Sequence, residues 1–336
     1  MINPTPSPCA LVTGGTGAIG PKLVRQLVTS GYQVKVLVRQ EPPAGLLPAH
    51  VEIIRGDICD KQRLEVALAG VDYVFHLAAK LHINNPPDHL IGEYERINVH
   101  GTCCVVEAAL AAQVQRLVFF STISVYGPSY NQSPITEQSL PNPQSLYAQT
   151  KYRAEQYILA ARRNPQDPAL GVVLRLGAVY GARIKGNYAR LVTALRRKRF
   201  LLIGSGQNRR TLVHERDVIE AALLAAESPQ AAGQIYNVTD GDTPTFNEIV
   251  TAICQSMGQP VPRWHLPEGP VRFLVQMTEQ GFHWVGQSPP VGHHTLDKLM
   301  EDVAVSGEKI QEELGFQPNF DLYTGWTIAL KELGLF

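Results

Sequence analysis

Several features that would assign this sequence of 336 residues to particular protein classes are scarce. Neither charge sign is in excess, because 30 Lys and Arg balance 30 Asp and Glu, and neither sign forms a long run. This balance gives no support to a role on nucleic acid or on a membrane surface. No apolar run reaches the roughly 18 residues of a membrane-spanning helix, and residues 1–8 lack the basic and apolar regions of a signal peptide. We therefore expect a cytoplasmic protein.

Cysteine is also scarce, and its placement argues against two further classes. The five cysteines are odd in number and show neither a metal-ligand spacing nor a disulfide framework. A reducing compartment fits this pattern best, and we expect no metal site. The length exceeds the common domain size, which predicts one large domain or a domain with a smaller lobe.

Short β-rich runs alternate with helical patterns through the first half of the chain, which predicts a parallel α/β sheet. The predicted strands are Cys9 to Val12, Lys35 to Val38, Val51 to Arg55, Tyr73 to Leu77, Leu117 to Ser121 and Val172 to Arg175. Long helices are predicted over 93–113 and 146–163, and a loop over 127–143. Shorter helices are predicted near 188–197, 217–226, 246–257 and 307–314. The segment 259–292 gives no clear pattern.

A glycine-rich turn follows the first predicted strand. Gly14, Gly17 and Gly20 stand where the apolar strand passes into a helix with apolar residues at helical spacing. In this context the first glycine permits a tight turn, the second lets the main chain approach a pyrophosphate, and the third lets the helix lie close to the strand. We therefore expect a Rossmann-type doubly wound parallel sheet that binds a dinucleotide in residues 1–177. Residues 178–336 should form a smaller C-terminal α/β substrate lobe, with some interleaving near 211–240.

The ends of the next strands should contact the adenosine and the dinucleotide backbone. Arg39 follows the second strand, where an arginine can accept a 2′-phosphate and an acid would bind the ribose 2′-hydroxyl, so NADP is favoured over NAD. Asp57 could accept a hydrogen bond from the adenine amino group, while Asp60 caps the following helix. Small residues after the fourth strand, at 78 and 79, would let the dinucleotide pass close to the backbone.

A candidate catalytic group comes from two segments. Tyr147 and Lys151 are four residues apart, which places them on one helical face. An ammonium near a phenol favours the phenolate, so the tyrosine could take a proton from an alcohol as hydride leaves its carbon. Thr122, at the end of the fifth strand, could share the substrate oxygen.

These motifs, in this order and spacing, resemble the extended short-chain dehydrogenases/reductases of the NAD(P)-dependent epimerase/dehydratase type. The resemblance covers nearly the whole chain and includes Asn98 to Thr102. It implies that Thr122 is the catalytic Ser/Thr, Tyr147 the acid/base and Lys151 the residue that holds the nicotinamide ribose. It also implies a site-shaping role for Asn98, whose alternative is a hydrogen bond within its own helix. The predicted cofactor-binding residues are Gly14, Gly17, Ala18, Ile19, Gly20, Arg39, Asp57, Ile58, Leu77, Ala78, Ala79, Asn98, Tyr147 and Lys151.

The resemblance also bears on the substrate. Family dehydratases carry an Asp-Glu pair after the catalytic hydroxyl residue, where this chain has Ile123 and Ser124, so a dehydratase is disfavoured. A nucleotide-sugar 4-epimerase or 4-ketoreductase is the leading hypothesis. The alternatives are a hydroxysteroid or other alcohol dehydrogenase, and a non-catalytic NADP-sensing regulator. The resemblance further implies a homodimer that pairs through the two long helices. The predicted substrate-binding residues are Lys80, His82, Thr122, Asn187 and Arg210.

Overall fold

The structure of the chain is a computed structural model that describes residues 7–81, 87–128, 133–183, 186–284 and 293–335. A seven-stranded sheet forms its centre, with the strand order β10-β6-β5-β4-β1-β2-β3. Every adjacent pair in this sheet is parallel. The strands are β1 (Cys9–Thr13), β2 (Gln33–Val38), β3 (Glu52–Arg55), β4 (Tyr73–His76), β5 (Arg116–Thr122), β6 (Gly171–Leu176) and β10 (Ile235–Val238). The α/β prediction with a doubly wound parallel sheet is confirmed.

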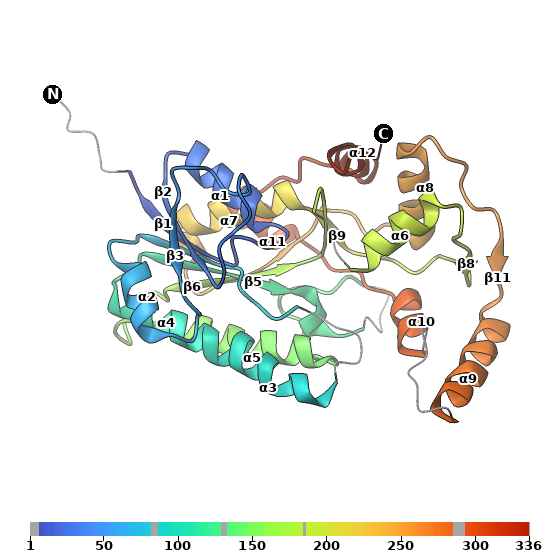
Figure 1. Cartoon of the computed structure of the whole chain (residues 1–336), viewed down its shortest axis with the longest axis horizontal. Coiled ribbons are helices and arrows are strands. Elements are labelled where there is room, and N and C mark those ends of the chain that lie inside the picture. Colours follow the sequence, from blue (N-terminus) through green and yellow to red (C-terminus); the bar gives the residue numbers. More distant parts are fainter. Residues whose placement is uncertain (1–6, 82–86, 129–132, 184–185, 285–292, 336) are drawn as a thin grey trace.

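Helices cover both faces of the sheet (Figure 1). One face packs against α1 (Gly20–Thr29), α7 (Glu215–Glu227) and α11 (Glu308–Leu314). The other packs against α2 (Lys61–Leu68), α4 (Gly101–Ala111) and α5 (Leu146–Ala160). Buried side chains alternate between these two cores along each strand: Ala10 and Val12 face the first, and Leu11 faces the second. A sheet buried on both faces explains the nearly continuous apolar runs of the predicted strands.

The strand order reverses beside β1, and this reversal sets the place for a ligand. From β1 the chain builds outward through β2 and β3, then returns to place β4 on the other side of β1. In such sheets ligands bind in the crevice at the carboxyl ends of the strands, next to the reversal. The turn after β1 and the ends of β4 and β5 therefore meet in one place.

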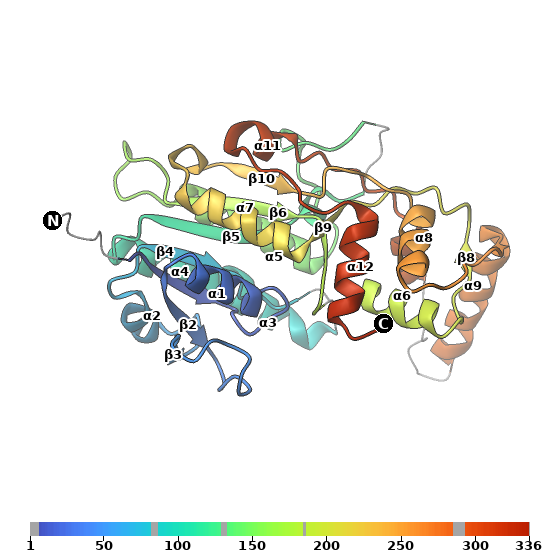
Figure 2. The same ribbon diagram turned by 90° about the horizontal axis from the view of Figure 1, so that it is seen from above.

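The remaining elements form a lobe at one end of the molecule, which Figures 1 and 2 both place far from the N-terminus. Its core contains α6 (Asn187–Arg196), α8 (Phe246–Ser256) and α12 (Leu322–Glu332). Two small sheets pair β7 (Ala178–Tyr180) with β9 (Leu212–His214), and β8 (Leu202–Ile203) with β11 (His265–Leu266). The helices α9 (Glu268–Trp284) and α10 (His293–Met300) complete it.

One predicted helix differs in detail, and some elements were not predicted. The expected helix 93–113 consists of α3 (Ile91–Tyr94), a π-helical segment η2 (Glu95–His100) and α4. The last strand of the sheet, β10, and the helix α12 were not predicted. Short 3-10 segments, η1 (Asp88–Leu90), η3 (Ile123–Tyr126) and η4 (Pro229–Ala231), lie in the connections. Among the described residues, no helix combines the length and apolar character needed to cross a membrane.

Candidate active site

A cavity of about 650 Å³ lies along the carboxyl ends of the sheet strands. It brings together the glycine turn after β1, the end of β2, the segments after β3 and β4, the end of β5 and the start of α5. Predicted cofactor residues that line it are Gly14, Gly17, Ala18, Ile19, Gly20, Arg39, Asp57, Ile58, Leu77, Ala78, Ala79, Tyr147 and Lys151. Of the predicted substrate residues, Lys80 and Thr122 also line it.

The turn after β1 requires glycine for two separate reasons. Gly14 has a φ of +73°, and a Cβ atom there would lie 2.7 Å from the backbone nitrogen of Ala78. At Gly20 a Cβ atom would lie 2.5 Å from the carbonyl oxygen of Gly15, so α1 packs directly on the turn. The backbones of the turn and of the segment after β4 therefore approach more closely than any side chain permits.

The first turn of α1 is suited to an anion. Its N-cap, Ile19, provides no side-chain hydrogen bond, and the turn contains no acidic residue. Pro21 occupies an N-terminal position that tolerates proline. Main-chain N–H groups at a helix N-terminus attract phosphate, because they lack partners in the helix and carry the positive end of its dipole. The residues at this end of the cavity therefore fit the pyrophosphate of a dinucleotide.

Arg39 and Asp57, which the sequence predicts to contact the adenosine, both line the cavity. Arg39 is exposed and lines the cavity. Burial would raise the pKa of Asp57, but hydrogen bonds from the Cys59 N–H and the Arg96 guanidinium hold it below its usual value. The predicted cap is confirmed, since Asp60 accepts a hydrogen bond from the Arg63 N–H at 3.2 Å.

Tyr147 and Lys151 project from one face of α5 into the cavity. Burial and the nearby Tyr94 raise the pKa of Tyr147 to about 12. Burial lowers the pKa of Lys151 to about 7, with partial compensation by Glu155. The expected lowering of the phenol pKa by an ammonium is therefore wrong for this structure. The physical reason is that the buried site disfavours both charged forms, phenolate and ammonium.

Thr122 ends β5 and caps the segment η3, where its Oγ1 accepts a hydrogen bond from the Ser124 N–H at 3.1 Å. The hydroxyl is half-buried at the cavity wall. The two following positions carry no acid: Ile123 is buried and Ser124 is exposed. Thr122 and Tyr147 line the same cavity, and the positions after Thr122 lack the carboxyl pair that is expected of a dehydratase.

Asn98 does not line the cavity but shapes its wall. Its Oδ1 accepts from the Lys80 N–H at 2.7 Å, and its Nδ2 donates to the Lys80 carbonyl at 3.2 Å. Nδ2 also donates to Thr150 Oγ1 at 3.1 Å, on the helix that carries Tyr147. The partners of these bonds lie outside the helix of Asn98, so Asn98 links the segment after β4 to α5. Lys80 in turn pairs with Glu93 at 2.7 Å.

A buried histidine, which sequence reasoning did not select, connects the same segments. The Thr102 hydroxyl donates to the Asn98 carbonyl at 2.8 Å, so it accepts from His76 Nε2–H at 3.0 Å. His76 Nδ1 then accepts from the Thr13 hydroxyl at 2.6 Å, and Thr13 Oγ1 accepts from the Ala78 N–H. Burial is the main cause that lowers the pKa of His76 to about 3. This chain of bonds requires neutral imidazole with its proton on Nε2.

An ion pair buried behind the catalytic residues was also missed. Arg175 Nη2 lies 2.6 Å from Glu155 Oε2, and both side chains are almost fully buried. Glu155 accepts a further hydrogen bond from Ser121 Oγ at 2.5 Å. Glu155 is four residues after Lys151 on α5, and Ser121 directly precedes Thr122. The signal in the sequence was an arginine at the end of an apolar strand, which needs a buried partner.

Two further predicted substrate residues, Asn187 and Arg210, do not line the cavity. Asn187 is exposed at the start of α6, and Arg210 donates a hydrogen bond to the Lys298 carbonyl. The neighbouring Arg209 pairs with Asp302 at 2.6 Å. His82 lies outside the described residues.

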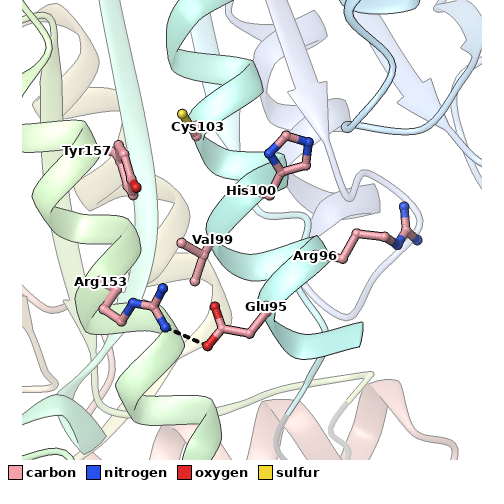
Figure 3. A pocket seen from close by; sticks show the side chains of 7 residues that line it. All are labelled: Glu95, Arg96, Val99, His100, Cys103, Arg153 and Tyr157. Atoms are coloured by element: carbon pink, nitrogen blue, oxygen red, sulfur yellow. Dashed lines mark hydrogen bonds and ion pairs between the residues drawn. The ribbon is translucent and has the colours of Figure 1, made fainter. Parts of the chain in front are cut away.

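A second, shallower pocket of about 410 Å³ lies on the outer face of η2, α4 and α5. Figure 3 shows Glu95 and Arg153 pointing toward one another across it, with their charged atoms 2.5 Å apart. Cys103 and Tyr157 line the other end. This is the helical face through which the resemblance predicts a second copy to pair.

Several known proteins are similar to this chain over most of its length. The chain is 31% identical over 313 residues to a 4-hydroxy-2-methyl-3-oxo-4-farnesyl-3,4-dihydroquinoline-1-oxide ketoreductase of Stigmatella aurantiaca, covering 91% of this chain and 90% of the relative. It is 30% identical to a UDP-glucose 4-epimerase of Vibrio cholerae, and the match covers 94% of this chain and 92% of the relative. The solved structure of MoeE5 in complex with UDP-glucose and NAD has a TM-score of 0.74 to this chain and a sequence 28% identical to it. The match covers 96% of this chain and 97% of the MoeE5 chain.

The match to a family model covers the region that builds the site. The model of the NAD dependent epimerase/dehydratase family matches residues 10–239, from β1 through β10. This range contains the glycine turn, Thr122, Tyr147 and Lys151, as the motif order predicted. The chain belongs to the NAD-dependent epimerase/dehydratase family of extended short-chain dehydrogenases/reductases, and it is an NAD(P)-dependent enzyme by that membership.

Proposed function

We propose that this enzyme oxidises or reduces one carbon of a nucleotide sugar, as a 4-epimerase or a 4-ketoreductase. The observation that carries the proposal is that Thr122, Tyr147 and Lys151 line the same cavity as the glycine turn after β1. A hydride donor or acceptor bound along that turn would end beside the tyrosine. The similarity to the Vibrio cholerae UDP-glucose 4-epimerase and to MoeE5, whose structure contains UDP-glucose and NAD, supports the substrate class.

In this proposal, different parts of the cavity bind different parts of the cofactor and substrate. The first turn of α1 holds the pyrophosphate, Arg39 and Asp57 contact the adenosine, and Lys151 holds the nicotinamide ribose. The cofactor supplies a hydride acceptor or donor at the inner end of the cavity. Because the pKa of Tyr147 is raised to about 12, its phenol keeps its proton at neutral pH. It can therefore donate a proton to a carbonyl oxygen as that carbon is reduced, and take it back in the reverse direction.

The surrounding network fixes this geometry. Thr122 shares the substrate oxygen with Tyr147, while the Asn98 side chain holds the cavity wall at Lys80 through two hydrogen bonds. Neutral His76 joins the ends of β1 and β4 to the Asn98 turn without adding charge. Because hydrogen bonds from several helices and strands fix the side chains of the site, the reacting groups are already positioned, and little entropy is lost during the reaction.

A second candidate is a hydroxysteroid or other alcohol dehydrogenase, and one observation favours it. Arg210, the predicted diphosphate contact, donates a hydrogen bond to the Lys298 carbonyl and does not line the cavity. The ketoreductase of Stigmatella aurantiaca, whose named substrate carries a farnesyl group and no phosphate, supports the same reading. A substrate without phosphate would not need Arg210.

The two candidates are separated by a substrate panel with the nucleotide content of the protein measured first. Freshly purified protein is denatured, and any released nucleotide is identified by chromatography and mass. The chain is then assayed with UDP-glucose for epimerisation, with a nucleotide 4-keto-sugar for reduction, and with steroid and other phosphate-free alcohols and ketones. Tightly held NAD with epimerised UDP-glucose supports the epimerase, because an epimerase retains its cofactor through both half-reactions. Turnover only of phosphate-free compounds would reject the nucleotide-sugar proposal.

The Arg210→Ala variant sharpens this comparison. If the substrate is a nucleotide sugar that Arg210 contacts after release from Lys298, its KM rises by about tenfold or more, as expected when a charge-assisted hydrogen bond is lost. An unchanged KM would count against the diphosphate contact. A non-catalytic NADP sensor, the third hypothesis, would bind the cofactor and turn over none of the panel.

We further propose a cytoplasmic homodimer with a preference for NADP. The preference rests on Arg39, which is exposed at the cavity where a 2′-phosphate would lie. The dimer rests on the face of η2, α4 and α5, where Tyr157 is 43% exposed. Sedimentation velocity should give twice the mass of one chain, and Tyr157→Arg should shift it toward one chain. Mass of a single chain at all concentrations would contradict the dimer.

A further inference from the structure

An exposed apolar face lies on the C-terminal lobe, away from the residues that line the cavity. We call it the lobe face, and it is formed by Leu201, Trp264, Leu266, Phe273, Leu274 and Met277. Trp264 is 79% exposed, and Phe273 and Leu274 are each 62% exposed. Large apolar side chains gathered in this way are uncommon on a monomer surface that contacts only water.

These residues lie in or next to the β8–β11 pair and on the helix that follows it. In the β8–β11 pair, Leu202 lies opposite His265 and Ile203 opposite Leu266, so Leu201 and Trp264 sit side by side at one end of it. The helix α9 begins directly after β11. On α9, Phe273, Leu274 and Met277 have the spacing of one helical side. Figure 1 places β8, β11 and α9 together, at the end of the molecule opposite β2 and β3.

A basic segment adjoins the lobe face. Arg196, Arg197, Lys198 and Arg199 are all exposed and directly precede Phe200 and Leu201. None of the four forms an ion pair with a described residue. The Gln259 side chain, on the segment that leads to Trp264, donates to the Arg196 carbonyl at 3.5 Å. Arg263, next to Trp264, is also exposed.

The acids nearest to the lobe face do not cancel this charge. Arg272 on α9 pairs with Glu268 at 2.6 Å and with Asp297 on α10 at 2.7 Å. Lys298 pairs with Glu301 at 2.9 Å. The other described acid on α9 is Glu279. The basic segment and Arg263 therefore leave an excess of positive charge beside the apolar side chains.

We propose that the lobe face docks this enzyme on an anionic lipid bilayer, with α9 lying in the plane of the interface. Apolar side chains of an amphipathic helix enter the boundary between headgroups and acyl chains, tryptophan is favoured there, and adjacent arginines and lysines are attracted to anionic headgroups. The sequence alone gives no support to a membrane-surface role, because the overall charge balance does not show that four basic residues, without an ion pair to any described residue, lie beside an apolar surface.

The test is flotation of the full-length protein with vesicles. One set is phosphatidylcholine alone, and the other is equal parts of phosphatidylcholine and phosphatidylglycerol. The protein should float with the anionic vesicles, float much less with the neutral ones, and be partly released by high salt, which screens the charge attraction. Arg197→Glu/Arg199→Glu and Phe273→Ser/Leu274→Ser should each lower the bound fraction by about tenfold or more.

Matched controls distinguish docking from loss of the fold. Val66→Ser changes an equally exposed apolar residue on α2, and Arg55→Glu/Arg162→Glu reverses two exposed charges elsewhere, so both should float like the wild type. Every variant should retain cofactor binding. Absence of flotation with anionic vesicles, or equal flotation of lobe-face and control variants, would overturn the proposal. If the wild type does not float with vesicles and Phe273→Ser/Leu274→Ser dissociates an oligomer, the lobe face is a subunit contact and the proposal is wrong.

Discussion

The ammonium nitrogen of Lys151 lies 3.7 Å from the centroid of the Phe119 ring, inside the core that supports the catalytic residues. The side chain is buried, and burial lowers its pKa from 10.5 to about 7. A contact with an aromatic face stabilises a cation only in part when water is excluded. The buried lysine therefore lowers the free energy of unfolding of the protein.

Replacing Lys151 with Met should stabilise the protein and abolish turnover. Below pH 7 lysine is protonated in both the folded and unfolded states and carries its full burial cost, on the order of 5 kcal/mol for a change in pKa from 10.5 to about 7. Between pH 7 and 10.5 the unfolded state binds the extra proton, so the stability of the wild type rises with pH. The advantage of Lys151→Met in urea unfolding should be largest at pH 7 and shrink toward pH 10.5. A constant difference over this range would contradict the lowered pKa.

The buried pair of Glu155 and Arg175 predicts strong coupling. Arg175→Met leaves a buried carboxylate without its partner and should lower the free energy of unfolding by about 3–5 kcal/mol. Glu155→Met should cost a similar amount, whereas the double variant should cost much less than the two changes together. Urea unfolding of the four proteins measures this cycle. Additive losses would show that the two side chains do not depend on each other.

Gly14→Ala tests the close approach of two backbones. Gly31 provides a matched control, since it also has a positive φ, +86°, but a Cβ atom there meets nothing within 4 Å. Gly31→Ala should cost about 1–2 kcal/mol of stability through backbone strain alone and leave cofactor binding intact. Gly14→Ala should cost more and abolish binding, because its Cβ would lie 2.7 Å from the Ala78 nitrogen. Equal behaviour of the two variants in NADPH titration would refute the assignment of this turn.

Arg39→Ala tests the cofactor preference. Loss of one charge-assisted hydrogen bond to the 2′-phosphate, worth about 1.5 kcal/mol, should raise the Kd for NADPH by about tenfold and leave the Kd for NADH unchanged. Arg55 at the end of β3 is also exposed and does not line the cavity, so Arg55→Ala is the control. Fluorescence titration gives both constants. An equal change for NADH and NADPH would reject the contact with the 2′-phosphate.

The sequence predicted the first six strands, the glycine turn and the cluster at the cavity because each depends on local spacing. Gly14 and Tyr147 belong to short motifs whose geometry is set by a turn or by one helix face. The edge strand β10 was missed because its four residues lie in the lobe half of the chain, and only the pairing with β6 makes them part of the main sheet. No local pattern specifies such a long-range pairing.

The missed site residues depend on contacts across the fold. His76 acquires its role from Thr13 and Thr102, which are 63 and 26 residues away in the sequence. The raised pKa of Tyr147 follows from burial that the spacing to Lys151 does not reveal. Arg210 was selected as a phosphate contact from its segment, whereas its bond to the Lys298 carbonyl arises from the packing of α10. Hydrogen-bond partners and burial determine these roles and pKa values, and both depend on the tertiary structure.

In the reaction that we propose, Tyr147 exchanges a proton with the substrate while hydride moves between the substrate and a cofactor held in this cavity. This role of Tyr147 is tested most directly by Tyr147→Phe, with the substrate identified in the panel and stopped-flow detection of NAD(P)H. We expect the variant to bind the cofactor with unchanged affinity and to transfer hydride about 10²–10⁴-fold more slowly than the wild type. Full turnover by Tyr147→Phe would contradict this role.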